Sequence, residues 1–481
     1  MRDSIGRDVS ASFVVFLVAM PLCMGIAMAS GLPPERGLLT GIIGGIVTGL
    51  LSGSPLGVSG PAAGLVVMVF AMVQQYGAAA LAPILLLAGA LQCLAGVLRL
   101  GRWFRAISPA VVHGMLAGIG LLIVAGQLHV MVDRKPGANG VENLLAAPAA
   151  FLDVLTPAGH GGAAALLVAL ATIAVMLGWE RLRPRALRLV PGALLGVLAG
   201  MALAAGFGLP VLHVSVPANF LDAVSLPALG SLARMAEPAL IVTAISLAFV
   251  ASAESLLSAS AVDQMQDRVR TDYDRELIAQ GVGNATCGLL GGLPLTGVIV
   301  RSSANVQAGA VTRLSTVLHG VIILLFVVLL PGVLSLVPTA TLAGVLVVTG
   351  WRLIGLHHVR ELLHRHGKAP VAIWAATVLG VVGVDLLSGV VIGIGLSLAE
   401  SARHFRRPAL RMRRLDAPAS TELHLAGTAT FLQLPRLISA VEAVPAAHAL
   451  RVRTRGLRHM DHTFASTLRD LVARRGGVVL S

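Results

Sequence analysis

The sequence predicts an all-α polytopic membrane protein with a small cytoplasmic α/β domain at its C-terminal end. Of its 481 residues, 56% are hydrophobic and only 12% are charged, whereas soluble domains carry about 25% charge. The chain contains 54 glycines and 24 prolines, residues that are more frequent in membrane helices than in soluble ones. Aromatic residues amount to only 4% and the apolar runs are continuous, which argues against a transmembrane β-barrel with aromatic girdles.

Fourteen apolar stretches predict membrane-spanning segments, most of them near the roughly 20 residues that cross a bilayer. They cover residues 10-30, 37-53, 60-75, 81-98, 109-131, 162-179, 190-207, 239-262, 277-292, 297-309, 314-331, 339-352, 369-384 and 386-402. If the chain starts inside, this order places most Lys and Arg residues of the loops on the cytoplasmic side, as the positive-inside rule requires. We therefore expect a multi-pass inner-membrane protein with both termini in the cytoplasm.

Three domains follow from this pattern. Residues 1-402 form the predicted transmembrane domain, residues 403-414 an arginine-rich linker, and residues 415-481 a short α/β module in which strand-like and helix-like patterns alternate. The formal net charge of +13 is concentrated after the last span. A basic segment at that place favours contact with anionic membrane lipid on the cytoplasmic side, and we expect no nucleic-acid partner.

Two spans, 60-75 and 297-309, are short and begin with glycine and proline. The chain reads Ser-Gly-Ser-Pro-Leu-Gly-Val-Ser-Gly-Pro-Ala-Ala-Gly over residues 52-64 and Gly-Gly-Leu-Pro-Leu-Thr-Gly-Val-Ile-Val-Arg over residues 291-301. Non-helical backbone at membrane depth is tolerated only where it is buried in protein or lines a cavity. These spans are third and tenth of fourteen, so they hold corresponding places in two halves of seven spans. Seven is odd, and the halves therefore form a 7+7 inverted repeat, with the binding site between two half-helices.

The chemistry of this site suits an anion. The N-terminus of a helix exposes free N–H groups and carries about +0.5 of an elementary charge. Arg301 lies about one turn into the second half-helix and adds a full charge. The alternative is that the glycines are packing kinks and that Arg301 belongs to a buried structural ion pair.

Glu254 is the acidic residue in the interior of a long span, and it shares a helix face with Ser258, four residues later. An ionisable residue at membrane depth is costly and usually functional. We expect Glu254 to line the site and to accept the coupled proton. The alternative is that it is a permanent partner of Arg301 without a role in proton transfer.

No pattern predicts an enzyme, a cofactor or a metal site. The membrane region has no Ser/His/Asp arrangement, phosphate-binding loop or zinc-ligand spacing. Four histidines, at positions 357, 358, 364 and 366, lie among arginine and glutamate in a predicted cytoplasmic connector, and we do not interpret them as metal ligands.

The motifs together resemble those of the SulP family of anion transporters. The motifs that carry the resemblance are residues 21-34 with Gly37 and Leu38, residues 58-61 (Val-Ser-Gly-Pro), residues 253-255 (Ala-Glu-Ser), residues 301-305 (Arg-Ser-Ser-Ala-Asn) and residues 308-310 (Ala-Gly-Ala). The resemblance covers about residues 8-402. The tail is similar to a truncated STAS domain, the sulfate-transporter and anti-sigma-antagonist module that follows such membrane regions.

The resemblance implies a core of spans 1-4 and 8-11 and a gate of spans 5-7 and 12-14, with elevator-type alternating access and a homodimeric state. It places the anion site on Ala62, Ala63 and Gly64 at one helix start and on Val298, Ile299, Val300 and Arg301 at the other, with Glu254 and Ser258 lining the same cavity. Sodium-coupled relatives tend to lack the arginine, so we do not expect sodium coupling here.

The sequence therefore predicts a secondary active transporter, either a symporter or an exchanger. Its substrate would be a small inorganic or carboxylate anion such as sulfate or bicarbonate, with protons coupled through Glu254. Two alternatives remain open, a passive anion channel and a nucleobase carrier of the related fold. The sequence does not choose among the anions.

Overall fold

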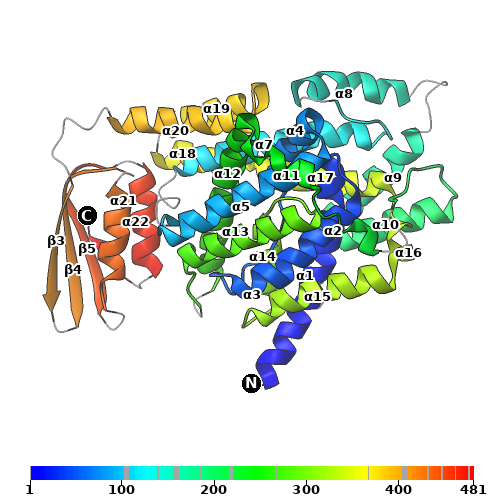
Figure 1. The fold of residues 1–481 in the computed structure, drawn as a ribbon. Helices are drawn as coiled ribbons and strands as arrows, with labels where there is room; N and C mark the ends of the chain where they lie inside the picture. The colour runs from blue at the N-terminus through cyan, green and yellow to red at the C-terminus, as the bar shows by residue number, and fades with distance from the viewer. Residues whose placement is uncertain are drawn as a thin grey trace. The chain divides into compact units, whose positions relative to one another are not determined.

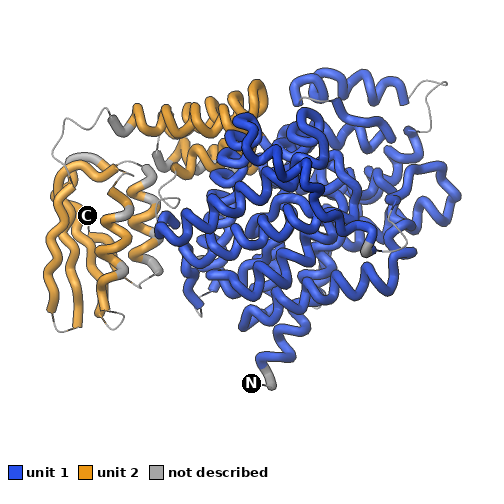
Figure 2. The backbone as a smooth tube through the Cα atoms, viewed as in Figure 1, with its two compact units in different colours: residues 1–101, 119–354 blue, residues 102–118, 355–481 orange. Residues whose placement is uncertain are grey.

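The computed structural model describes residues 2–101, 108–137, 140–154, 162–184, 187, 189–215, 220–266, 269–366, 368–402, 410–417, 419–430, 433–445, 448–460, 462–474 and 477–480. The chain divides into two compact units, one of residues 1–101 and 119–354 and the other of residues 102–118 and 355–481 (Figure 2). Residues 403–409 of the predicted linker lie outside the described part.

The first unit is mostly helical, with two short strands in its interior. Its first half contains α1 (Arg2–Ala29), α2 (Pro34–Ile43), the π-helix η1 (Gly44–Thr48), α3 (Gly49–Leu51), β1 (Ser59–Pro61), η2 (Ala63–Leu65), α4 (Val66–Tyr76), η3 (Ala78–Ala80), α5 (Leu81–Val97), α7 (Pro109–Val130, which begins in the second unit), α8 (Gly140–Val154), α9 (Gly162–Leu182) and α10 (Gly192–Gly206). Its second half contains η5 (Phe220–Ala223), α11 (Leu229–Ala233), η6 (Arg234–Ala236), α12 (Pro238–Met265), α13 (Tyr273–Leu290), β2 (Leu295–Gly297), α14 (Ile299–Gln307), α15 (Leu314–Leu329), α16 (Pro331–Leu334) and α17 (Thr339–Ile354).

Five described helices are long and apolar enough to cross a membrane. They are Ser4–Ala29, Ala78–Val97, Pro109–Val130, Gly162–Leu182 and Pro238–Asp263. Shorter apolar helices are Ala63–Tyr76, Gly192–Gly206, Leu314–Leu329, Thr339–Ile354, Lys368–Gly383 and Leu386–Glu400. Each of these helices falls on a predicted span, and the remaining predicted spans 37-53, 277-292 and 297-309 are helical as well. The count of fourteen membrane crossings and the 7+7 repeat stay predictions.

Close packing of glycines shapes the second predicted span. A Cβ on Gly45 would lie 2.6 Å from the Cα of Gly320, and a Cβ on Gly44 would lie 2.5 Å from the carbonyl oxygen of Ser59. Only residues without a side chain allow backbones to approach so closely. The chain of η1 therefore passes directly against both α15 and β1, which puts it next to the strands that carry the site.

The second unit ends in a small α/β sheet domain. Before it come α18 (Leu356–His366), α19 (Lys368–Gly383) and α20 (Leu386–Ala402). The domain itself contains β3 (Arg411–Ala417), β4 (Ser420–Ala429), α21 (Leu434–Glu442), β5 (Ala449–Met460), α22 (His462–Arg474) and β6 (Val478–Leu480). The strand order is β3-β4-β5-β6, in which β3 pairs antiparallel with β4 and the other pairs are parallel. Helices α21 and α22 cover one face of the sheet (Figure 1).

Strand β3 begins inside the segment that the sequence predicts to be linker. Met412 of this strand packs against the domain core formed by residues such as Leu423, Val452 and Phe464. The arginines on either side of Met412 conceal its strand character in the sequence, because they are exposed at the sheet edge. On β4, Glu422 accepts a hydrogen bond from His424 and also lies beside Arg453, so the pKa of Glu422 is below its usual value.

Candidate functional site

Two short strands join the predicted half-helices in the interior of the first unit. Strand β1 pairs antiparallel with β2, with Ser59 opposite Gly297, Gly60 opposite Thr296 and Pro61 opposite Leu295. All six residues are buried. Each strand leads directly into a helix, β1 into η2 and α4, and β2 into α14. Because the strands are antiparallel, the two helices run in opposite directions and their N-termini meet at the strand pair.

Neither helix start is capped by its own N-cap side chain. Ala62 and Val298 hold the N-cap positions in extended conformations, with φ/ψ of −98°/126° and −110°/115°. Alanine and valine are poor N-caps because they have no side-chain acceptor for the first N–H groups of the helix. No N-cap side chain therefore competes with an anion for the N–H groups and positive dipole ends of these helices.

The carboxylate of Glu254 lies at the start of the first of these helices. Glu254 belongs to α12 and accepts a hydrogen bond from the backbone N–H of Gly64. Both carboxylate oxygens lie 2.7 Å from the position that a Cβ on Gly64 would take. Its Oε2 atom has no hydrogen-bond partner in the described part of the chain. Glu254 thus places a negative group where an anion would bind.

Ser258 and Ser255 hold the end of β2 rather than facing the helix starts. The hydroxyl of Ser258 donates a hydrogen bond of 2.6 Å to the carbonyl oxygen of Gly297, and the N–H of Gly297 donates to the hydroxyl of Ser255 at 3.1 Å. Ser258 is only 3% exposed. The structure therefore places Ser258 beside the site as a support for the strand that precedes α14.

Arg301 lies on the other face of the strand pair. It is fully buried, and its Nη1 atom fills the space where a Cβ on Gly60 would be. Residues that face each other across antiparallel strands have their side chains on the same side, so Thr296 points toward this face as well. The face with Gly297 instead meets Ser255 and Ser258 of α12. None of the three guanidinium nitrogens has a hydrogen-bond partner among the described residues.

Direct contact between Arg301 and an anion therefore stays a prediction, and the structure gives only the position of the side chain, against Gly60. The guanidinium lies behind the strands, and its charge reaches the helix starts through one layer of backbone. The same arrangement accounts for Glu254, whose carboxylate bonds to Gly64 and not to Arg301. The alternative of a permanent Glu254 and Arg301 ion pair is therefore not supported.

The other expected site residues border the helix starts. Ala62 and Gly64 are buried and Ala63 is half-buried, while Ile299 and Val300 are 39% and 43% exposed. Val298 is half-buried. These side chains are small or apolar, so the polar groups at the helix starts are the backbone N–H groups and the carboxylate of Glu254.

Asn284 holds strand β2 in place, a role that the sequence alone did not predict. Its Oδ1 accepts from the N–H of Leu295 at 2.8 Å, and its Nδ2 donates to the carbonyl oxygen of Leu295 at 3.1 Å. Nδ2 also donates to Oε1 of Gln92, whose amide reaches Ser252. The side-chain amide of Asn284 thus pairs with the backbone of Leu295 as a neighbouring strand would. The signal in the sequence was a polar residue inside an apolar span.

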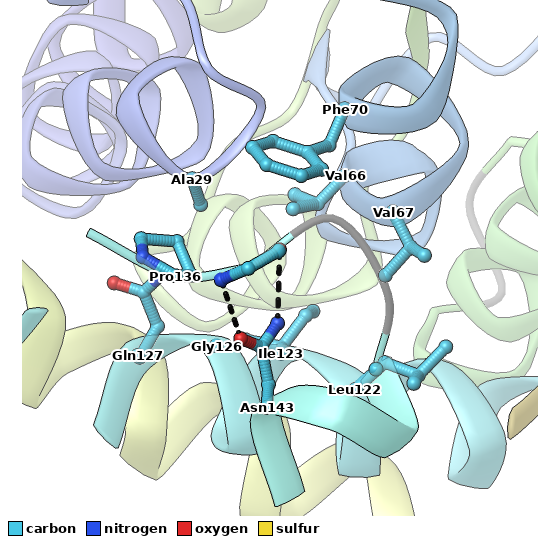
Figure 3. Close-up of a pocket in the computed structure, with 12 residues that line it drawn as sticks. Ala29, Val66, Val67, Phe70, Leu122, Ile123, Gly126, Gln127, Pro136 and Asn143 are labelled. Carbon is cyan, nitrogen blue, oxygen red and sulfur yellow. Dashed lines mark hydrogen bonds between the residues drawn. The ribbon is translucent and has the colours of Figure 1, made fainter. Parts of the chain in front are cut away.

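A recess between α4, α7 and the segment leading to α8 has no charged residue in its lining. It is lined by residues such as Phe70, Ile123 and Pro136, and Asn143 closes it with two hydrogen bonds to the backbone of Gly137 (Figure 3). Its volume is about 40 Å³. Among the described residues, no three His, Cys, Asp or Glu side chains are grouped to hold a metal ion.

Comparison with known proteins agrees with this arrangement. The profile of the Sulfate permease family matches residues 5–377. The putative sulfate transporter YvdB of Bacillus subtilis is 32% identical over 397 residues, which cover 81% of this chain and 72% of that protein. The bicarbonate transporter BicA of Picosynechococcus is 24% identical over 444 residues, which cover 89% of this chain and 75% of that protein.

Solved structures show the same fold. The transmembrane domain of a cyanobacterium bicarbonate transporter BicA superimposes with a TM-score of 0.69 at 24% identity, over 80% of this chain and 97% of that one. The murine Solute Carrier 26 family member A9 anion transporter, in the inward-facing state, superimposes with a TM-score of 0.71 at 16% identity, over 100% of this chain and 85% of that one.

Proposed function

Because the chain belongs to the sulfate permease family of membrane anion transporters, we propose that it is a secondary active transporter of a small anion such as sulfate or bicarbonate. The observation that carries the proposal is the meeting, at the β1 and β2 pair, of two helix N-termini whose N-cap residues provide no side-chain cap. Two such ends together offer about one positive charge without any side chain. The buried charge of Arg301 adds to this field, which suits an anion better than a neutral nucleobase.

Proton coupling follows from the position of Glu254. Its carboxylate takes the N–H of Gly64, which belongs to the same helix start as the proposed anion site. The ionised carboxylate of Glu254 and an anion bound at the same helix start repel each other. When Glu254 is protonated, it loses its charge and becomes a weaker acceptor, so the helix start becomes available to the anion. A proton and an anion therefore bind together, which is the requirement for symport.

The larger architecture belongs to the same proposal. We propose two inverted halves of seven spans, and the antiparallel pairing of β1 with β2 is consistent with such a repeat. The spans would form a core and a gate, and the core would move in an elevator-type manner. We place the chain in the inner membrane with both termini in the cytoplasm. A homodimeric state and contact of the basic tail with anionic lipid complete the proposal.

Uptake into proteoliposomes tests this function. The wild type and Glu254→Gln are reconstituted and supplied with labelled sulfate, bicarbonate or fumarate, with and without an inward proton gradient. We expect saturable uptake of at least one anion that the gradient accelerates in the wild type only. Acceleration that persists in Glu254→Gln would remove the proton role of this residue. Uptake of labelled nucleobase and of none of the anions would overturn the anion proposal, and non-saturating flux would indicate a channel.

A further inference from the structure

The guanidinium of Arg301 lies among fully buried polar side chains, here called the compartment, and the transport proposal uses none of the others. The compartment is defined by five fully buried residues from α1, β2, α14 and α15, which are Cys23, Thr296, Arg301, Asn305 and His319. None of these side chains is a carboxylate. The positive charge of Arg301 is therefore not neutralised by any member of the compartment.

Glycines bring these groups together. Gly41 and Gly45 lie one turn apart along α2 and η1, and their absent Cβ atoms would lie 2.8 Å from Sγ of Cys23 and 3.0 Å from Cε1 of His319. Gly44 lies against the backbone of Gly60, whose own Cβ space is filled by the guanidinium. The face of α2 and η1 that carries these glycines thus contacts the thiol of Cys23 and the imidazole of His319. It also contacts Gly60, which lies against the guanidinium. The charge of Arg301 acts electrostatically on both Cys23 and His319.

The compartment contains unpartnered donors and unpartnered acceptors. Among the described residues, the guanidinium of Arg301 has no oxygen or nitrogen acceptor and has only the weakly accepting thiol of Cys23 beside it. Nε2 of His319, Oγ1 of Thr296 and Oδ1 of Asn305 likewise have no hydrogen-bond partner in this part of the chain. A guanidinium can only donate hydrogen bonds, so it needs acceptors. Buried polar groups of both kinds in one place are normally satisfied by each other or by ordered water.

His319 is suited to be such an acceptor. Its Nδ1 lies 2.8 Å from the carbonyl oxygen of Thr316, which can only accept, so Nδ1 carries the proton. The other ring nitrogen, Nε2, then presents a lone pair as long as the ring is neutral. A second positive charge beside the guanidinium of Arg301 is unfavourable, which keeps the ring in this form.

We propose that His319 is a positioning residue for Arg301. Its neutral imidazole accepts a hydrogen bond from the guanidinium, directly or through an ordered water, and holds the charge against Gly60 behind the strand pair. Thr296 and Asn305 supply further acceptors. The inference deepens the proposed anion site and rests on it for its effect on transport, while the interaction of His319 with Arg301 is independent of which substrate is carried.

Transport kinetics give the first test, with labelled sulfate and bicarbonate as probes. His319→Leu removes the acceptor, and we expect its KM to rise roughly tenfold, the effect of losing one hydrogen bond to a charged group, with kcat changed much less. His319→Gln restores an acceptor and should keep a KM near that of the wild type. His129→Leu is the matched control, because His129 is also a buried helical histidine whose ring nitrogen lies near the carbonyl oxygen four residues earlier. Equal KM values for the Leu and Gln variants would overturn the proposal.

A double-mutant cycle gives a second test that needs no transport. The thermal unfolding of detergent-purified wild type, His319→Leu, Arg301→Met and the double variant is compared. We expect His319→Leu to lower the melting temperature in the wild type and to change it little in the Arg301→Met background. An equal decrease in both backgrounds would show that His319 only fills space. If no anion is transported but the cycle shows coupling, the proposed function fails and the role of His319 stands.

Discussion

The carboxylate of Glu254 occupies the space that a side chain on Gly64 would need, with both oxygens 2.7 Å from the absent Cβ. On the opposite face of the strand pair, the guanidinium of Arg301 fills the Cβ space of Gly60 in the same manner. The two glycines thus leave room for an acidic and a basic side chain next to the backbone, Glu254 on one side of the strand pair and Arg301 on the other. The strand pair keeps them apart, so that neither neutralises the other.

Gly64→Ala should move the carboxylate of Glu254 away from the helix start. The new methyl group would meet only the end of a flexible side chain, so we expect the fold to be retained and the gradient dependence of anion uptake to fall. Initial rates at several proton gradients measure this effect. Gly178→Ala is the control, since nothing lies within 4 Å of its Cβ position. Unchanged gradient dependence in Gly64→Ala would contradict a coupling role for this contact.

Arg301→Ala should weaken anion binding without abolishing the site. A unit charge a few ångströms from the helix starts contributes about 1–4 kcal/mol, depending on the local dielectric, which corresponds to roughly a fivefold or greater increase in KM. Saturation curves for sulfate and bicarbonate measure the change. Arg313→Ala is a comparison at a half-buried position, where the arginine donates an exposed hydrogen bond to the carbonyl oxygen of Leu50. An unaltered KM would mean that Arg301 serves stability alone.

Ser258→Ala should lower stability more than it lowers affinity. The substitution leaves the carbonyl oxygen of Gly297 without its 2.6 Å hydrogen bond, and an unsatisfied buried carbonyl costs about 1–3 kcal/mol. We therefore expect a lower melting temperature in detergent with KM changed by less than about threefold, equivalent to less than ~1 kcal/mol. Ser335→Ala, which removes an exposed local hydrogen bond, should leave the melting temperature unchanged. A large increase in KM at normal stability would instead make Ser258 a ligand.

Deletion of residues 411–481, which removes the sheet domain from the start of β3, should leave the transport chemistry intact. The sheet domain has a hydrophobic core of its own, and the strands and helix starts of the site lie in the first unit. We expect lower expression or weaker assembly, measured by yield and size-exclusion chromatography, with an unchanged KM. Loss of substrate saturation in a truncated protein that is well folded would contradict this division of labour.

The sequence by itself determined that the chain is a helical membrane protein with two interrupted spans and an α/β tail. It also determined the family, because the glycine and proline motifs that permit close backbone approach are local and retain their spacing. The start of β3 could not be located, since exposed arginines alternate with the residues that face the core. The count of membrane crossings depends on loop assignment and stays a prediction.

Only the tertiary structure decided on which face of the strand pair each charged residue lies. Gly60 and Thr296 are paired across more than two hundred residues of sequence, and this register sends Arg301 to one face and Ser258 with the end of β2 to the other. Helical periodicity within one span contains no information about such a pairing. For the same reason, the sequence left open an ion pair between Glu254 and Arg301 as an alternative, whereas the intervening strands give each of them a different set of neighbours.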